Sequence, residues 1–219
     1  MADRFVDLSH AIEHGLVTYP GLPAPAIDAL FDHDESRGRY GPGTEFHIGR
    51  ITMVANTGTY LDAPFHRFRD GADIAELELA RLADLPGVLL TAPARERSIG
   101  PELLPDADLR GQAVLVRTDW SRHWGRPSYF DDHPFLTEPL GAALVERGAA
   151  LVGIDSLNID DTLDGARPVH TALLRAGIPI VEHLTNLAAL PPRGFRFSAV
   201  PARVRRFGTF PVRAFAVLP

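Results

Sequence analysis

Short runs of apolar and β-branched residues, separated by turn residues, dominate the pattern of this chain. Some runs alternate apolar and polar positions, which is typical of a strand with one buried face. Others are continuously apolar, which is typical of a strand that is buried on both faces. The predicted strands are residues 4–8, 47–54, 88–91, 113–118, 151–154, 178–181, 195–200 and 212–217.

Helical patterns are fewer than strand patterns. The clearest covers 138–147, because Thr137 is a suitable N-cap and Gly148 a suitable stop. A second predicted helix covers 168–177, and a shorter one covers 75–83.

The order of these elements indicates an α/β protein. Strand, helix and strand follow one another from 113–118 through 151–154 to 178–181, which predicts a partly parallel sheet covered by helices. The number of strands requires additional sheet elsewhere. Proline and glycine are spread as turn residues and form no linker, so we expect a single domain over residues 1–219.

Composition narrows the class of protein. The chain has 219 residues, of which 45% are hydrophobic, enough for a substantial core. No apolar run approaches the roughly 20 residues that a membrane helix needs, and the first residues do not resemble a signal peptide. We therefore expect a cytoplasmic protein with no membrane partner.

Charge and cysteine content restrict the chemistry further. The chain has no cysteine, so a cysteine nucleophile is excluded and any metal ion must take nitrogen and oxygen ligands. Its formal charge of -6 disfavours nucleic acid as a partner, because phosphate binding needs a concentrated basic surface.

A row of polar side chains is predicted near residue 60. In an extended segment, residues of the same parity point to one face, which here would carry an amide, a phenol, a carboxylate and an imidazole. The alternative is a polar strand edge that leads into a turn. The row consists of Asn56, Gly58, Tyr60, Asp62, Pro64 and His66.

His170 and Glu182 are predicted to meet. A helix rises about 1.5 Å per residue and a strand about 3.3 Å, so a chain that reverses at Gly177 brings Glu182 back to the level of His170. Glu182 also ends an apolar run, where a buried acid needs a partner. The alternative is an unrelated surface pair.

Three nearby residues are weaker candidates. His183 follows Glu182 and is expected to face the opposite side of the strand. Asn158 and Asp160 follow a predicted strand end, where α/β sheets often place ligand contacts, although a solvated Asx turn would also explain them.

Segment 56–66 resembles the His-x-Gly-Thr-His-x-Asp-x-Pro-x-His motif of the cyclase family, which includes the bacterial kynurenine formamidases and isatin hydrolase. The residues that match are Gly58, Thr59, Asp62, Pro64 and His66. Asn56 and Tyr60 stand where that family has histidines. Other segments resemble further blocks of the family in the same order, namely 5–9, 19–21, 151–156, the 168–177 helix, 180–187 and 211–214.

The resemblance implies a β/β/α fold with a mixed sheet and a site for zinc or manganese. By position, Asp62, His170 and Glu182 match a set of metal ligands in the family, and His66 matches its general acid/base. Asn56 and Tyr60 replace two further ligands. An amide oxygen is a poor zinc ligand, and a phenol with its ordinary pKa of about 10 binds only when the metal deprotonates it.

Three kinds of site remain open. The first is an enzyme with one divalent metal ion held by Asp62, His170 and Glu182. The second is a metal-free site in which these residues and His66 transfer protons, while Tyr60 and Asn56 donate hydrogen bonds to a substrate oxyanion. The third is a protein that binds a small molecule without converting it.

The function that we expect is hydrolysis of a small amide, lactam or lactone, with an aromatic or cyclic substrate. His66, Asp62 and Tyr60 are the candidate catalytic residues, and Asn56, Tyr60 and Phe65 the candidate substrate contacts. The alternatives are a metal-free cyclase, isomerase or dehydratase, and a non-catalytic binding protein. The resemblance also implies a homodimer or homotetramer.

Overall fold

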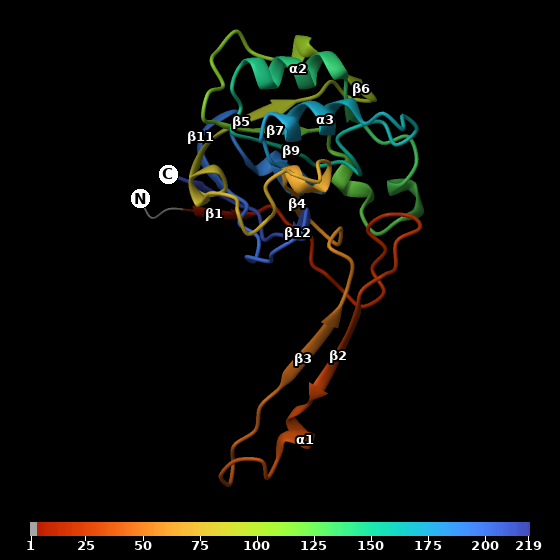
Figure 1. The fold of residues 1–219 in the computed structure, drawn as a ribbon, viewed down its shortest axis with the longest axis vertical. Coiled ribbons are helices and arrows are strands. Elements are labelled where there is room, and N and C mark those ends of the chain that lie inside the picture. The colour runs from red at the N-terminus through yellow and green to blue at the C-terminus, as the bar shows by residue number, and fades with distance from the viewer. Residues whose placement is uncertain (1–3) are drawn as a thin grey trace.

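The structure is a computed structural model that describes residues 4–219, and a nine-stranded mixed sheet forms its centre (Figure 1). Four neighbouring strands, β5, β7, β9 and β10, are parallel, and the remaining pairs are antiparallel. In spatial order the strands are β1 (Arg4–Asp7), β13 (Phe215–Leu218), β11 (Arg193–Ser198), β5 (Leu85–Thr91), β7 (Ala113–Arg117), β9 (Leu151–Ile154), β10 (Ile180–Glu182), β4 (Tyr60–Asp62) and β12 (Thr209–Pro211).

Two helices, α2 (Glu138–Glu146) and α3 (Pro168–Arg175), cover one face of this sheet (Figure 1). The alternation along β7 shows how the two cores are separated. Val114 and Val116 pack into the core beneath the helices, whereas Ala113 and Leu115 belong to the core on the opposite face. The central strands are therefore buried on both faces, as their continuous apolar sequence predicts.

Short elements connect these layers. Strands β6 (Ser98–Ile99) and β8 (Phe135–Leu136) form a small parallel pair. The 3₁₀ turns are Pro64–His66, Leu79–Arg81, Pro101–Leu103, Trp120–His123, Pro127–Tyr129 and Leu187–Ala189.

Most predicted elements are confirmed, including the helices that begin at residues 138 and 168. The predicted helix over 75–83 is wrong, because only the turn Leu79–Arg81 forms there. The carboxylate of Asp73 accepts hydrogen bonds from the backbone N–H groups of Ala75 and Glu76, which stabilises a turn instead of a helix. Of the predicted strand 212–217, only residues 215–217 form a strand, as part of β13. Residues 212–214 lie between β12 and β13, where the Ser9 hydroxyl bonds the backbone of Ala214.

A two-stranded ribbon projects from the body of the protein (Figure 1). It consists of β2 (Ala26–Phe31) and β3 (Ile48–Thr52), with the short helix α1 (His33–Ser36) near its tip. The predicted strand at 47–54 is confirmed, but it lies in this ribbon and not in the main sheet. We call residues 26–52 the arm.

Within residues 4–219, no helix is long and apolar enough to cross a membrane.

Gly153 provides a test of the packing in the central sheet. A Cβ atom at this position of β9 would lie 2.7 Å from Cδ1 of Leu184 and 2.9 Å from Cδ2 of Leu115. We expect Gly153→Ala to lower the free energy of unfolding by about 1–3 kcal/mol, because both neighbours are buried and must move. Urea denaturation measures this loss. Gly165→Ala is the matched control, since no atom lies within 4 Å of its added Cβ. Equal stability of both variants would contradict this account.

Candidate active site

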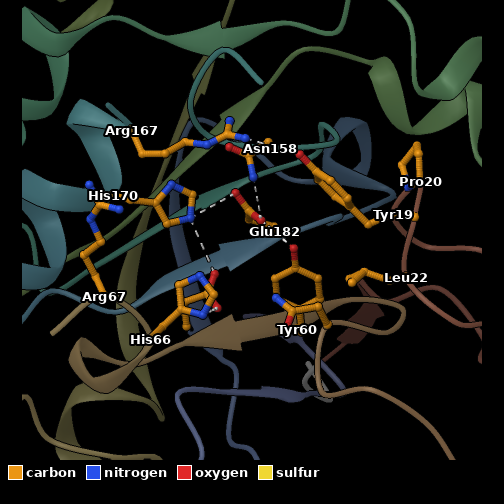
Figure 2. A pocket seen from close by; sticks show the side chains of 13 residues that line it. Tyr19, Pro20, Leu22, Tyr60, His66, Arg67, Asn158, Arg167, His170 and Glu182 are labelled. Carbon is orange, nitrogen blue, oxygen red and sulfur yellow. Dashed lines mark hydrogen bonds and ion pairs between the residues drawn. The ribbon is translucent and has the colours of Figure 1, made fainter. Parts of the chain in front are cut away.

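A cavity of about 430 Å³ opens where β4, β10 and the start of α3 face the N-terminal segment (Figure 2). Its volume lies within the range of small-molecule sites. The residues that line it are Tyr19, Pro20, Gly21, Leu22, Asn56, Tyr60, Asp62, His66, Arg67, Asn158, Arg167, His170 and Glu182.

The pairing of β4 with β10 brings two predicted site residues together. The two strands are antiparallel, in a register that sets Tyr60 directly opposite Glu182. Opposite side chains in such a pair lie on the same face, and the Tyr60 hydroxyl donates a hydrogen bond to Oε2 of Glu182 at 2.7 Å. Burial and the neighbouring carboxylates of Glu182 and Asp62 raise the pKa of Tyr60 well above 10, so the phenol is neutral.

The polar row predicted near residue 60 is confirmed at Asn56, Tyr60, Asp62 and His66, which all line the cavity. His66 reaches it from the 3₁₀ turn Pro64–His66 and not from an extended strand. The turn sets Nδ1 of His66 3.6 Å from Oδ1 of Asp62 and 2.9 Å from the hydroxyl of Thr209.

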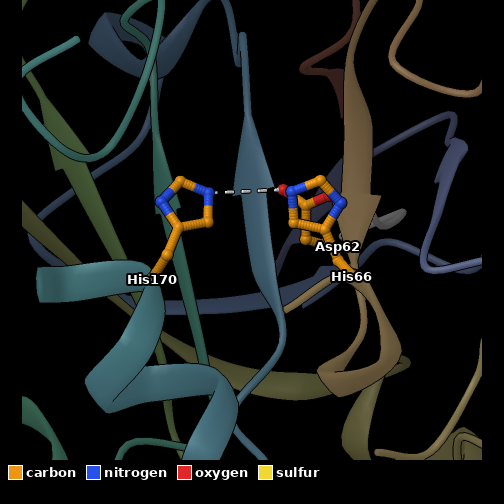
Figure 3. A group of neighbouring side chains, drawn as sticks. All are labelled: Asp62, His66 and His170. Atoms are coloured by element: carbon orange, nitrogen blue, oxygen red, sulfur yellow. Dashed lines mark ion pairs between the residues drawn. The ribbon is translucent and has the colours of Figure 1, made fainter. Parts of the chain in front are cut away.

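The predicted meeting of His170 and Glu182 is also confirmed. Nε2 of His170 lies 3.6 Å from Oε1 of Glu182 and 3.7 Å from Oδ2 of Asp62. Figure 3 shows His170 on one side of this gap, with Asp62 and His66 on the other. Helix α3 and strands β10 and β4 thus place three ionisable groups around one point.

Asp160 orients His170, and this role was missed from the sequence. Its carboxylate accepts hydrogen bonds from the backbone N–H groups of Val169 and His170, at 2.7 and 3.0 Å, and contacts Nδ1 of His170 at 2.7 Å. Since Nδ1 faces a carboxylate, Nε2 is left facing the cavity. The Asx turn considered for Asn158 and Asp160 exists, but it is buried and not solvated.

The electrostatics of the cluster depend on His170. Burial alone would lower the pKa of His170, but Asp160, Asp62 and Glu182 outweigh burial and raise it to about 10. Burial raises the pKa of Glu182 to about 7, although the charge of His170 opposes this. Burial also opposes ionisation of Asp62, yet His66 and His170 hold its pKa below the ordinary value. Without a metal ion the cluster therefore holds an imidazolium among carboxylates.

The donor set fits a divalent metal ion. Oδ2 of Asp62 is buried and has no hydrogen-bond partner among the described residues. Asp62, His66 and His170 each offer a ligand atom within 4.8 Å of the others. The separations of 3.6 and 3.7 Å around Nε2 of His170 are close to the roughly 3.4 Å between neighbouring ligands of tetrahedral zinc.

Glu182 remains a predicted ligand, but it is more constrained than the sequence suggested. Its Oε1 accepts a hydrogen bond from the backbone N–H of Ile159 at 2.7 Å, while Oε2 accepts from Tyr60 and, at 3.4 Å, from Asn158. The group with metal-ligand spacing contains His66 in place of Glu182.

Two predicted neighbours lie outside the cavity. Phe65, a predicted substrate contact, lines an adjoining depression that shares Asn56 and His66 with the cavity, so its contact with substrate stays a prediction. His183 does not line the cavity, as expected, and its ring packs 5.0 Å from that of Tyr60. Burial lowers the pKa of His183 to about 3, so this imidazole is neutral.

We expect Asp160→Asn to lower the affinity for a divalent metal ion about 10- to 100-fold, because a neutral amide holds His170 less firmly than a carboxylate. Calorimetric titration with zinc measures the change. Asp164→Asn is the matched control, since Asp164 is an exposed acid in the same loop. Unchanged affinity in Asp160→Asn would show that this contact does not position the ligand.

Comparison with known proteins identifies the family that shares this sequence and fold. Residues 6–161 match the family described as "Putative cyclase". The kynurenine formamidase of Bacillus cytotoxicus is 29% identical over 97% of both chains, and that of Geobacillus thermodenitrificans is 28% identical over 98% of this chain and 97% of the relative.

Solved structures share the fold. A potential metal-dependent hydrolase with cyclase activity superposes with a TM-score of 0.82 at 24% identity, covering 100% of this chain and 99% of the other. Isatin hydrolase A from Ralstonia solanacearum gives a TM-score of 0.84 at 24% identity, covering 99% and 92%. The β/β/α fold inferred from the resemblance is confirmed, and the chain belongs to the cyclase family.

Proposed function

We propose that this protein hydrolyses a carbon–nitrogen bond in a small amide or lactam, in the manner of an arylformamidase or isatin hydrolase. The observation that carries the proposal is the convergence of Asp62, His170 and Glu182 on one point of the cavity. Relatives named kynurenine formamidase, which match over nearly the whole of both chains, support the same reaction class. A related lactone would suit the same site.

The cofactor that we propose is a single zinc or manganese ion. Asp62, His170 and Glu182 would hold it, since the mixed nitrogen and oxygen donors suit either metal. A divalent ion there supplies a Lewis acid that makes water a nucleophile near neutral pH. Asn56 and Tyr60 do not offer a second metal site, because the phenol of Tyr60 is neutral and bonded to Glu182.

His66 is the residue that we propose to transfer the proton to the leaving nitrogen. Its side chain is 37% exposed at the cavity, while Thr209 and Asp62 hold its Nδ1 side. An imidazole can both donate and accept a proton, which suits it to general acid/base catalysis. One imidazole cannot both bind the metal ion and transfer the proton. We assign proton transfer to His66.

A metal-free cyclase, isomerase or dehydratase is the second candidate function. The observation that favours it is the presence of two neutral hydrogen-bonding groups, Asn56 and Tyr60, at the cavity wall. Such groups can stabilise a developing oxyanion without activated water.

We further propose that the protein is a homodimer or a larger homo-oligomer assembled through the arm. An isolated two-stranded ribbon is at best marginally stable in water. Ile27 and Ile51 are paired across the ribbon and are 38% and 47% exposed. The arm begins at Ala26, shortly after the cavity-lining segment 19–22.

We expect protein purified without chelator to carry one divalent metal ion per chain, and His170→Ala to abolish binding because it removes the only buried nitrogen donor of the predicted set. Elemental analysis and metal titration measure both quantities. His123→Ala, outside the cavity, is the control. Stoichiometric metal in His170→Ala would contradict the assignment, and a metal-free active wild type would favour the second candidate function.

We expect His66→Ala to lower kcat for an aryl formamide by about 10²-fold or more, because the leaving nitrogen loses its proton donor. Metal content and the thermal unfolding midpoint should change little, since the ring is partly exposed. Loss of the metal in this variant would instead identify His66 as a ligand. Full activity would remove it from the mechanism.

We expect the double variant Ile27→Asp, Ile51→Asp to convert the oligomer to a monomer, because two charges would face each other in the proposed apolar contact. Light scattering coupled to size exclusion measures the mass. Leu79→Asp is the control, since Leu79 is 66% exposed on the body of the protein. A monomeric wild type, or an oligomer that survives the double variant, would contradict the role of the arm.

A further inference from the structure

Two arginines line the cavity without an acidic partner. Arg67 donates from Nη2 to the carbonyl of Ala166 at 2.9 Å and from Nε to the hydroxyl of Thr171 at 3.2 Å. Arg167 donates from Nη1 to the carbonyl of Asp161 at 2.9 Å. Neither guanidinium forms an ion pair within residues 4–219, although a guanidinium is best matched by a carboxylate.

Of the two arginines, Arg167 is better placed to contact a ligand in the cavity. It immediately precedes α3 and lies three residues before His170, in the left-handed backbone region with φ 50°. Figure 2 shows its guanidinium extending over the cavity toward Asn158 and Tyr19. Arg67 is exposed, and its bonds to Ala166 and Thr171 tie its own turn to the start of α3.

The contacts of Arg167 hold it in place and leave room for a ligand. Nη1 is fixed by the short bond to Asp161, whereas Nη2 makes only long bonds of 3.4 Å to the hydroxyl of Tyr19 and the carbonyl of Thr162. A carboxylate would replace those contacts by charge-assisted bonds of about 2.8 Å.

The helix N-terminus beside Arg167 is not available to an anion. Its first free backbone N–H groups, at Val169 and His170, already donate to Asp160. The reacting bond belongs at Asp62, His170 and Glu182, which line the same cavity and where the proposed metal ion would activate water. An anionic substrate is therefore oriented, with its charged group at Arg167 and its amide at the cluster.

We propose that Arg167 binds a carboxylate of the substrate and thereby selects amides or lactams whose aromatic part carries an acid group. This assignment rests on the proposed hydrolase function, and it adds a recognition group to that site. Arg167 acts in binding and orientation and does not touch the reacting bond.

Binding of two probes tests the assignment independently of turnover. 2-Aminobenzoate and 2-aminobenzamide have nearly the same shape and differ in charge. We expect the wild type to bind the benzoate about 10- to 100-fold more tightly, the range that a charged hydrogen bond provides. Arg167→Gln should abolish this preference and Arg167→Lys should keep part of it. Arg69→Gln, an exposed arginine outside the cavity, should leave it unchanged.

The same comparison with and without chelator separates Arg167 from the metal ion. A preference that persists in Arg167→Gln would show that another group binds the carboxylate, and this would overturn the assignment. So would an equal loss of affinity for both probes, which is the result expected if Arg167 only secures its loop. If the wild type binds both probes equally well, the assignment is overturned, whether or not Arg167→Gln folds.

Turnover of 2-formamidobenzoate and 2-formamidobenzamide distinguishes this inference from the proposed function. We expect Arg167→Gln to lower kcat/KM for 2-formamidobenzoate about 10- to 100-fold, mainly by raising KM. The kcat/KM for 2-formamidobenzamide should change less than about twofold. If neither compound is hydrolysed by the wild type, the proposed formamidase activity fails, while the binding experiment still decides the role of Arg167.

Discussion

The antiparallel pairing of β4 with β10 is the constraint on which the site depends. Its register sets Tyr60 opposite Glu182 and directs Asp62, two residues further along, to the same face. A shift by one residue would turn these three side chains into the core on the other face. Leu61 and Val181, which are fully buried in that core, hold the register in place.

Asp160 adds what the sheet cannot supply, which is the orientation of His170. One carboxylate both caps the start of α3 and contacts Nδ1 of its third residue, so the helix and the imidazole are fixed by the same group. This explains how an eight-residue helix that begins at a proline can hold a side chain within 3.7 Å of two strands.

The features that were predictable from the sequence depend on local periodicity. Strand alternation places Tyr60 and Asp62 on one face, and the rises of a helix and a strand bring His170 level with Glu182. Asp160 could not be found in this way, because a loop without regular structure separates it from the helix that it caps. The same alternation points the odd-numbered Phe65 away from Tyr60 and Asp62, and this side chain borders an adjoining depression.

The replacement of two family histidines by neutral residues changes the balance of charge in the site. Replacing two histidines by Asn56 and Tyr60 removes nitrogen donors but leaves three buried carboxylates, Asp62, Asp160 and Glu182, around one imidazole. Buried carboxylates need positive charge or hydrogen bonds nearby. The phenol of Tyr60 and the backbone of Ile159 satisfy Glu182. His170 faces both Asp160 and Asp62, and the Thr209 hydroxyl donates to Oδ1 of Asp62. Oδ2 of Asp62 is the one oxygen of the three carboxylates without a hydrogen bond in the described chain, so the remaining capacity for a cation is concentrated beside His170.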